Sequence, residues 1–268
     1  MSNKQKLERY LCVFMNGNLN MLNPIRVISL DRTPERFTMF QKFNFHLPIQ
    51  RVSACEGGEI KKEEYIESGI FSGDLEYSVG AMGIAVSHIR LWQEAVSENS
   101  VRHVAEDDAI IRNDFYQIFA EADVAIKGWD IFLWGYNDDW PVGLSSYFKA
   151  VVSLEGKAHS QDFISGNYSS FQLEERKPSF LPLASAAGIG LYSVSPQGAQ
   201  KLLDKCLPLA NHKAKYAKDT SVSWSNTGLD VEMSRHYEDM NAYLSFPPMA
   251  LMINDMENST IRGSNIFK

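Results

Sequence analysis

Three adjacent carboxylates, Glu106, Asp107 and Asp108, follow an apolar run at residues 101–105 that predicts a buried strand. One interpretation is a loop whose acidic residues favour the start of the next helix through its dipole. The other is a metal site, because like charges this close raise one another's pKa unless a cation neutralises them. Mg²⁺ and Mn²⁺ bind carboxylate oxygens and usually keep substrate phosphates as further ligands. The second interpretation therefore predicts metal-assisted chemistry on a diphosphate.

Common motifs that bind phosphate or activate a nucleophile are absent from the sequence. There is no GxxxxGK[ST] segment, and the stretch GIGLYS fails the GxGxxG pattern because it ends at Ser193. Neither an HExxH motif nor a GxSxG nucleophile elbow occurs. A nucleotide diphosphate would therefore be held by the metal, by residues at strand ends and by a few basic groups. That arrangement is typical of a glycosyltransferase that uses a nucleotide sugar.

The first half of the chain alternates predicted strands and helices. Residues 25–30 predict a buried strand, and a Thr-Pro pair then supplies the N-cap and first residue of a helix. Apolar residues at helical spacing predict further helices over residues 84–98 and about 114–126, and residues 129–135 predict another strand. This order favours a mainly parallel α/β sheet. Ligands of open α/β sheets bind at the carboxyl ends of the strands, where the acidic triplet lies.

The second half of the chain lacks this regular alternation of predicted strands and helices. Turn residues and short β-prone stretches over residues 138–182 predict a smaller antiparallel portion. A strand over residues 186–194 and a helix capped by Ser195 follow. Residues 211–228 show no clear period and predict a mobile loop, and residues 229–239 predict a short helix. We expect the tail, residues 245–263, to be extended and loop-like.

Composition limits the class of protein. The chain has 268 residues, of which 44% are apolar, and its formal charge of −7 argues against a nucleic-acid partner. Cys12, Cys55 and Cys206 are far apart and lack CxxC spacing, which indicates a reducing compartment and argues against disulfides or a zinc–thiolate site. We see neither a secretory signal nor a window of 18 apolar residues. We therefore expect a soluble, intracellular α/β protein.

Six segments in order resemble glycosyltransferase family 25, the family of bacterial lipopolysaccharide galactosyltransferases and collagen galactosyltransferases. The similarity runs from about residue 25 to residue 262. It implies a GT-A type nucleotide-sugar-binding fold, a UDP-sugar donor that is usually UDP-galactose, Mn²⁺ or Mg²⁺, a lipo-oligosaccharide acceptor and inversion at the anomeric carbon. We expect one domain, with about residues 25–137 binding the nucleotide and about 138–268 on the acceptor side. The segments are VISLDRTPERF, VGAMGIAVSHIRLW, VAEDDA, WDIFLWG, GLYSVSPQGAQKLL and LD.

The resemblance implies roles for the acidic triplet, which corresponds to the family's Glu-Asp-Asp motif. Asp108 is the first expected metal ligand, with Glu106 and Asp107 next. These two would orient the ribose, the diphosphate or the ion.

The resemblance further implies donor-binding residues in the two segments that precede the triplet. Ser29 and Leu30 would edge the uridine pocket, and Arg32 and Arg36 match basic positions after the first strand. The alternative for the arginines is a surface pair at a helix start. His88 matches the second residue of a Ser-His pair and would bind the donor, whereas the alternative is a satisfied core histidine. Trp92, one turn further on, is expected in the core.

Asp230 is the expected catalytic base, since inversion requires a carboxylate to take the proton of the attacking hydroxyl. It follows Gly228-Leu229 where the family has Pro-x-Asp, and its alternative role is a helix cap. Competing acids are Glu232, Asp239 and Asp255.

Departures from the family pattern leave other functions open. Ala81 and Ile84 stand where the family commonly has Glu and Cys, so the donor sugar could differ from galactose, or the chain could be an inactive nucleotide- or glycan-binding relative. A nucleotidyltransferase is a third reading, but the turn after the first strand has no glycine.

Acceptor recognition is assigned to the variable second half of the chain. Trp224 could stack on a sugar ring. Lys213, Lys215 and Lys218 either meet a lipid-linked glycan at the membrane or form a solvated surface run. Arg262 and Ser264 could belong to a C-terminal motif of the family. We expect a cytoplasmic enzyme with at most peripheral membrane contact.

Overall fold

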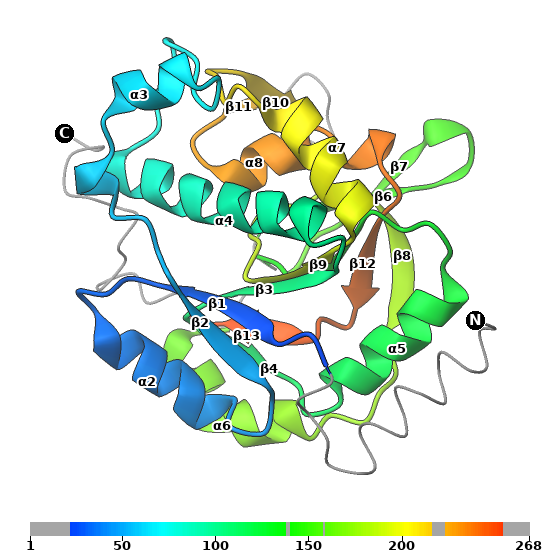
Figure 1. Cartoon of the computed structure of the whole chain (residues 1–268). Helices are drawn as coiled ribbons and strands as arrows, with labels where there is room; N and C mark the ends of the chain where they lie inside the picture. Colours follow the sequence, from blue (N-terminus) through cyan, green and yellow to red (C-terminus); the bar gives the residue numbers. More distant parts are fainter. Residues whose placement is uncertain (1–21, 138–139, 158, 216–222, 254–268) are drawn as a thin grey trace.

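A mixed sheet with helices on both faces forms the centre of the computed structural model, which describes residues 22–137, 140–157, 159–215 and 223–253 (Figure 1). The sheet has nine strands in the order β2-β1-β3-β9-β5-β12-β8-β6-β7. Helices α4 and α7 cover one face, and α2 and α5 lie on the other (Figure 1). Each face has its own cluster of buried apolar side chains. This is an α/β architecture consistent with the expected GT-A type fold.

Parallel strands dominate the half of the sheet that contains β1, as predicted. Strands β2, β1, β3, β5 and β12 run in one direction, and β9 runs against them between β3 and β5. The segment before β9 therefore reaches the same sheet edge as the carboxyl ends of β1 and β3. The bounds are Ile25–Ser29 for β1, Ile49–Ser53 for β2, Arg102–Glu106 for β3, Ile131–Gly135 for β5, Leu191–Val194 for β9 and Ala242–Phe246 for β12.

The smaller antiparallel portion is also present. Strand β8 (Ser179–Ser185) pairs antiparallel with β12 and with β6 (Val142–Ser145), and β6 pairs antiparallel with β7 (Val151–Leu154). The same segment contains a helix that the sequence pattern did not predict, α6 (Gln161–Gln172). Gln172, at its end, is buried and donates to the carbonyl oxygens of residues 43 and 111, which joins α6 to the main body.

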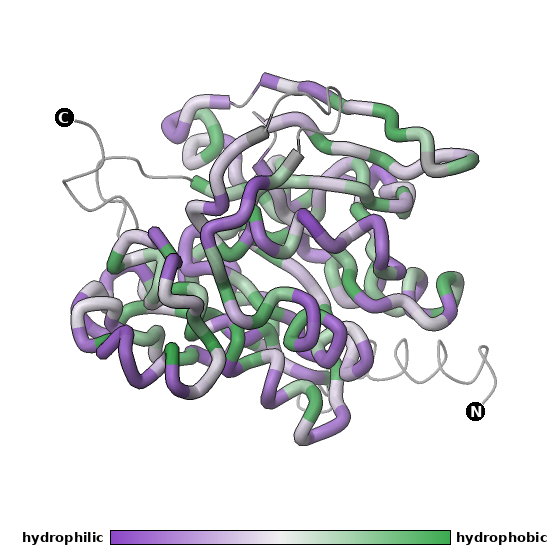
Figure 2. Tube along the Cα trace, turned by 90° about the horizontal axis from the view of Figure 1, so that it is seen from above, coloured by the Kyte–Doolittle hydropathy of each residue, from purple (hydrophilic) through white to green (hydrophobic). Residues whose placement is uncertain are grey.

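The predicted helices all form, but α4 begins five residues before its expected start and α8 ends five residues before its expected end. Ser195 caps α7 by accepting from the Gly198 N–H group, and Ser78 caps α4 in the same way through Ala81. Thr33 precedes α2 but makes no side-chain capping bond. Hydrophilic and hydrophobic residues interleave along the helices, as one-sided burial requires (Figure 2). The bounds are Pro34–Phe43 for α2, Val79–Ser97 for α4, Phe115–Ala125 for α5, Pro196–Cys206 for α7 and Leu229–Ser234 for α8.

Several short elements differ from the sequence expectation. Strand β2 and helix α3 (Lys62–Glu67) were not predicted. Of the tail expected to be loop-like, the structure describes residues 245–253, which contain the end of β12 and all of β13 (Ala250–Met252). β13 pairs with β4 (Ala109–Ile111), directly after the acidic triplet. Part of the expected mobile loop pairs as β10 (Lys213–Lys215) and β11 (Ser223–Ser225). Such short strands are stabilised by distant partners, so they leave little local pattern.

No helix of the described residues combines the length and apolar character needed to cross a membrane. Residue Trp92 is fully buried, as expected for a core residue.

Two glycine substitutions should have opposite effects on stability. A Cβ atom on Gly83 of α4 would lie 2.5 Å from the Cys55 carbonyl oxygen and 2.9 Å from the Gly57 nitrogen. We expect Gly83→Ala to lower the free energy of unfolding by about 1–3 kcal/mol, because backbone must move. Gly166 lies in the exposed interior of α6, where an added Cβ atom would have nothing within 4 Å. Gly166→Ala should raise the free energy of unfolding by about 0.5–1 kcal/mol.

Denaturant unfolding followed by circular dichroism measures both changes. Equal effects of the two substitutions would contradict the close approach of α4 to the segment around Cys55.

Candidate functional site

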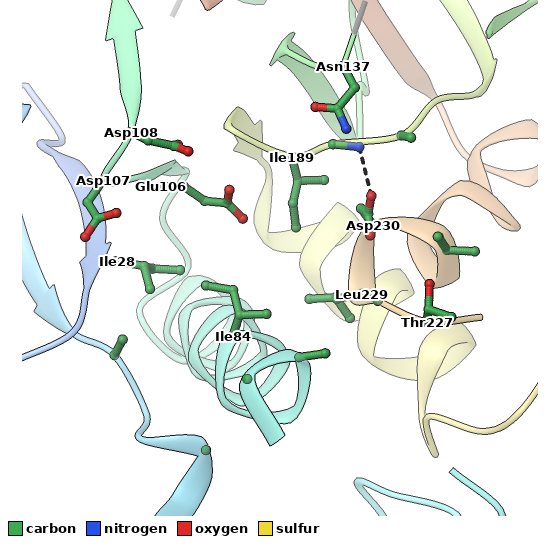
Figure 3. A pocket seen from close by; sticks show the side chains of 18 of the residues that line it. Ile28, Ile84, Glu106, Asp107, Asp108, Asn137, Ile189, Thr227, Leu229 and Asp230 are labelled. Atoms are coloured by element: carbon green, nitrogen blue, oxygen red, sulfur yellow. Dashed lines mark hydrogen bonds between the residues drawn. The ribbon is translucent and has the colours of Figure 1, made fainter. Parts of the chain in front are cut away.

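A cavity of about 490 Å³ lies at the edge of the sheet where β1 and β3 end. The start of α4, the segment before β9 and the start of α8 complete its wall (Figure 3). Eight of the nine residues assigned to the site from the sequence line this cavity; His88 does not. The eight are Ser29, Leu30, Arg32, Arg36, Glu106, Asp107, Asp108 and Asp230.

Asp107 is the carboxylate of the triplet that the protein itself neutralises. Its Oδ1 atom accepts from Nε and Nη2 of Arg36 at 2.8 and 2.6 Å, and its Oδ2 atom accepts from the Ser29 hydroxyl at 2.7 Å. These bonds tie together the ends of β1 and β3 and the first turn of α2. Asp107 therefore positions the neighbouring backbone, and Arg36 is held as its partner.

Asp108 is held without such compensation. Its Oδ1 atom is buried and has no hydrogen-bond partner among the described residues. Burial, followed by the charge of Glu106, raises the pKa of Asp108 to about 7, although Arg36 opposes the shift. Buried polar atoms normally have partners, so an orphaned carboxylate oxygen calls for one from outside the chain. A hard divalent cation fits this donor chemistry.

Glu106 also projects into the cavity, from the last position of β3 (Figure 3). Its Oε1 atom lies 3.8 Å from Nε2 of His88. Glu106 and Asp108 are thus the two residues of the triplet that could hold a metal ion. Two carboxylates do not complete a coordination sphere, so phosphate oxygens or water would have to supply further ligands.

A second cluster of metal-binding residue types lies outside the cavity. Cys206, Glu232 and His236 form the one group of three in the described part of the chain whose ligand atoms lie within 4.8 Å of one another. Glu232 is already fully engaged, because it accepts from Asn226 at 2.7 Å, Arg235 at 2.6 Å and His236 at 3.1 Å. Burial raises the pKa of the Cys206 thiol, which disfavours the thiolate that a metal needs. This cluster is an internal polar network.

Asp230 stands on the opposite side of the cavity from the triplet (Figure 3). Its Oδ2 atom accepts from the Gly188 N–H group at 2.9 Å, across to the segment before β9. Burial, and then the charge of Glu106, raise the pKa of Asp230, while the bond from Gly188 lowers it. A Cβ atom on Gly228 would lie 2.8 Å from Oδ1 of Asp230, so this glycine leaves room for the carboxylate.

The other acids considered as a base do not reach the cavity. Glu232 is only 1% exposed and is engaged as described above, and Asp239 is exposed outside the cavity. Asp255 lies outside the described residues, as do Lys218, Arg262 and Ser264. Asp230 is therefore the one of these candidates that the described structure brings to the site.

Arg32, Ser29 and Leu30 form the rim on the β1 side. Arg32 pairs with Glu56 at 3.0 Å and its side chain is 55% exposed, so it remains available to an anionic ligand. The Leu30 carbonyl oxygen accepts from the Thr33 N–H group and retains a lone pair, whereas the Ser29 carbonyl oxygen accepts from both the Ala54 N–H group and Nη2 of Arg51.

His88 lies behind the wall of the cavity rather than in it. Its side chain is fully buried on α4, which differs from the donor-binding role expected from the sequence. The neighbouring Ser87 is also structural, since its hydroxyl accepts from the Cys55 N–H group and donates to the Gly83 carbonyl oxygen.

Two tryptophans line the cavity together with Asp230. The rings of Trp140 and Trp224 have centroids 5.5 Å apart and an interplanar angle of 61°, and Trp140 is 41% exposed. Trp140, Asn137 and Gly188 were not predicted as site residues. Asn137 and Trp140 follow the strand predicted over residues 129–135, and Gly188 lies within the stretch predicted as a strand, which begins only at Leu191 in the structure.

A comparison with protein families found a match for this chain. The sequence model described as Glycosyltransferase family 25 (LPS biosynthesis protein) matches residues 22–221, which include β1, the triplet and β9. Asp230 lies beyond the matched range. A comparison with curated proteins found no match.

The raised pKa of Asp108 predicts how the stability of the metal-free protein depends on pH. Because the folded-state pKa of about 7 exceeds the ordinary value of 3.8, the folded state holds a proton that the unfolded state has released. Stability should therefore fall as pH rises from about 4 to about 7. We expect Asp108→Asn to raise the melting temperature by a few degrees at pH 8, with a difference that shrinks towards pH 4.

Thermal unfolding in chelator across this pH range measures the effect. Asp239→Asn, which neutralises an exposed acid outside the cavity, is the control and should show no such trend. A variant that is less stable than the parent protein at pH 8 would contradict the uncompensated burial of Asp108.

Proposed function

The chain belongs to glycosyltransferase family 25, and on that premise we propose that it transfers galactose from UDP-galactose to a hydroxyl of a lipo-oligosaccharide, with Mn²⁺ or Mg²⁺ and with inversion. Membership of this family indicates a glycosyltransferase of lipopolysaccharide biosynthesis. The donor, the metal, the stereochemistry and a cytoplasmic location, at most peripheral to the membrane, belong to the proposal. One observation carries it: Glu106 and Asp108 line the same cavity as Asp230, from opposite sides (Figure 3).

The side of the cavity next to β1 suits a nucleotide diphosphate. Glu106 and Asp108 would hold the ion, Ser29 and Leu30 would edge the uridine, and Arg32 would meet the diphosphate. When bound, the ion would neutralise the charge that grows on the departing UDP. Arg36 donates two hydrogen bonds to Asp107, so its role in the proposed site would be to fix the end of β3 rather than to bind the diphosphate.

Asp230 suits the role of general base. Inversion by a single displacement needs a carboxylate that removes the proton of the acceptor hydroxyl as it attacks. The raised pKa of Asp230 makes it a stronger base than an ordinary carboxylate, and the bond from Gly188 fixes one of its oxygens. The other oxygen would face the acceptor.

Trp140 and Trp224 suit an acceptor sugar. Both rings line the cavity that Asp230 also lines, and they give it flat apolar surfaces, which sugar-binding sites use to cover the apolar face of a ring. The hydroxyl-bearing residues Ser225 and Thr227 line the same cavity and would accept or donate hydrogen bonds. We assign the acceptor to the part of the cavity that Trp140, Trp224, Ser225 and Thr227 line.

The identity of the donor sugar rests on the family resemblance. Ala81 and Ile84 line the cavity and supply no polar group where the family commonly has Glu and Cys. Galactose is therefore the first sugar to test, followed by other UDP-hexoses. A degenerate relative that binds a nucleotide or a glycan without transfer is the alternative.

Thermal unfolding with UDP, GDP or CMP, each with Mn²⁺ or with EDTA, tests the proposal. A ligand at about 100 times its dissociation constant adds roughly 2.7 kcal/mol, which moves the midpoint by a few degrees. We expect a shift only with UDP plus Mn²⁺, lost in Asp108→Asn and kept in Asp239→Asn. A shift that persists in EDTA would contradict the metal, and no shift with any nucleotide would favour a glycan-binding relative.

Replacing Trp140 should separate the acceptor from the donor. We expect Trp140→Ala to raise the KM for a lipo-oligosaccharide acceptor about tenfold, which is roughly 1.4 kcal/mol of lost binding, and to leave the KM for UDP-galactose unchanged. Phe148→Ala removes a fully exposed aromatic ring outside the cavity and is the control. A rise in the donor KM instead would contradict the assignment of this part of the cavity to the acceptor.

A further inference from the structure

We propose that His88 is a positioning residue that acts on Glu106, an inference that rests on the proposed function. Held from behind by Tyr192 and Trp92, His88 presents an N–H group to the Glu106 carboxylate and so orients it towards the metal ion.

The back of the His88 ring is fixed by two hydrogen bonds in series. Nδ1 of His88 lies 2.9 Å from the Tyr192 hydroxyl, and Nε1 of Trp92 donates to the same hydroxyl at 3.0 Å. The His88 and Tyr192 rings also stack, with centroids 5.6 Å apart and an interplanar angle of 27°. All three side chains are fully buried, so the ring has little freedom to turn.

This arrangement selects the tautomer of His88. Trp92 has only a donor, so the Tyr192 oxygen accepts from it and its own proton is available to Nδ1 of His88. Burial raises the pKa of Tyr192, so the phenol keeps that proton. With Nδ1 as the acceptor, the neutral ring carries its hydrogen on Nε2.

The Nε2 atom of His88 faces the Glu106 carboxylate. It is buried and lacks a hydrogen-bond partner among the described residues, and Oε1 of Glu106 lies 3.8 Å away. A satisfied core histidine would not leave this atom unpartnered. The remaining distance is longer than a hydrogen bond, and contacts of this kind tighten when ligands bind. Closure of this gap would draw one carboxylate oxygen towards His88 and leave the other for the ion.

The chain of hydrogen bonds from Trp92 through Tyr192 to His88 can be called a relay. A second relay of the same kind lies in the same sheet and serves as a comparison. Ser193, the next residue of β9, accepts from Nε1 of Trp134 at 2.7 Å and lies 2.7 Å from Nδ1 of His103. Adjacent strand residues point to opposite faces, so this relay lies on the far side of the sheet, and its histidine does not line the cavity. The two relays share their chemistry, but only one ends at a candidate metal ligand.

Four variants test the inference. His88→Leu removes the donor, whereas His88→Gln keeps an N–H group at a similar reach. Tyr192→Phe removes the hydroxyl that fixes the ring, and Ser193→Ala makes the matched change in the other relay. Mn²⁺ affinity in the presence of UDP, measured from the electron paramagnetic resonance signal of free Mn²⁺, is the main readout. The kcat and KM for UDP-galactose and the thermal midpoint accompany it.

We expect His88→Leu to weaken Mn²⁺ binding and to lower kcat by about 10- to 100-fold, the range seen when partners of metal ligands are removed. His88→Gln should stay within a few-fold of the parent protein. Tyr192→Phe should weaken Mn²⁺ binding measurably, whereas Ser193→Ala should lower the thermal midpoint and leave Mn²⁺ affinity unchanged. If His88→Leu does not fold, the isosteric Tyr192→Phe carries the test against Ser193→Ala.

Parent-like Mn²⁺ affinity in both His88→Leu and Tyr192→Phe would overturn the positioning role and leave the proposed function intact. Equal impairment of His88→Gln and His88→Leu would also overturn it. A parent protein that binds no Mn²⁺ with UDP would overturn the proposed function, and this inference with it.

Discussion

Negative charge is crowded at the carboxyl end of β3, and each of the three carboxylates there is accommodated differently. Asp107 is paired with Arg36 inside the protein. Asp108 keeps a buried oxygen that has no partner in the described part of the chain, and Glu106 faces Nε2 of His88 at a distance too long for a hydrogen bond. Like charges so placed repel, and burial strengthens the repulsion. The fold therefore stores an unfavourable arrangement that a bound cation would relieve.

The elements around the acidic triplet form the walls of the cavity and fix the positions of its residues. The antiparallel direction of β9 brings Gly188 to the edge where β3 ends, and Gly188 in turn fixes Asp230. The buried network around Glu232 secures the short helix that carries Asp230. On the opposite side, α4 packs its glycine backbone against the segment near Cys55. The Gly188–Asp230 and Gly83–Cys55 contacts join residues distant in sequence, whereas the network around Glu232 is local.

Local pattern accounts for much of what the sequence predicted. The long helices have apolar periodicity and, at Ser195, a capping residue, and the acidic triplet has residue types that suit one chemistry. The strand that includes residues 250–252 has no such signal, because it forms only against β4. The role inferred for His88 was likewise hidden, since it depends on Tyr192, which is 104 residues away. The Trp140–Trp224 pair is invisible in sequence for the same reason.

The most direct test of the proposed metal site is a crystal structure grown with UDP and Mn²⁺, with the anomalous scattering of manganese used to locate the ion. The account predicts an anomalous peak in direct contact with Asp108, with Glu106 and the diphosphate of UDP completing its ligands. A peak at Cys206, Glu232 and His236 instead, or UDP bound in the cavity with no ion beside Asp108, would contradict it.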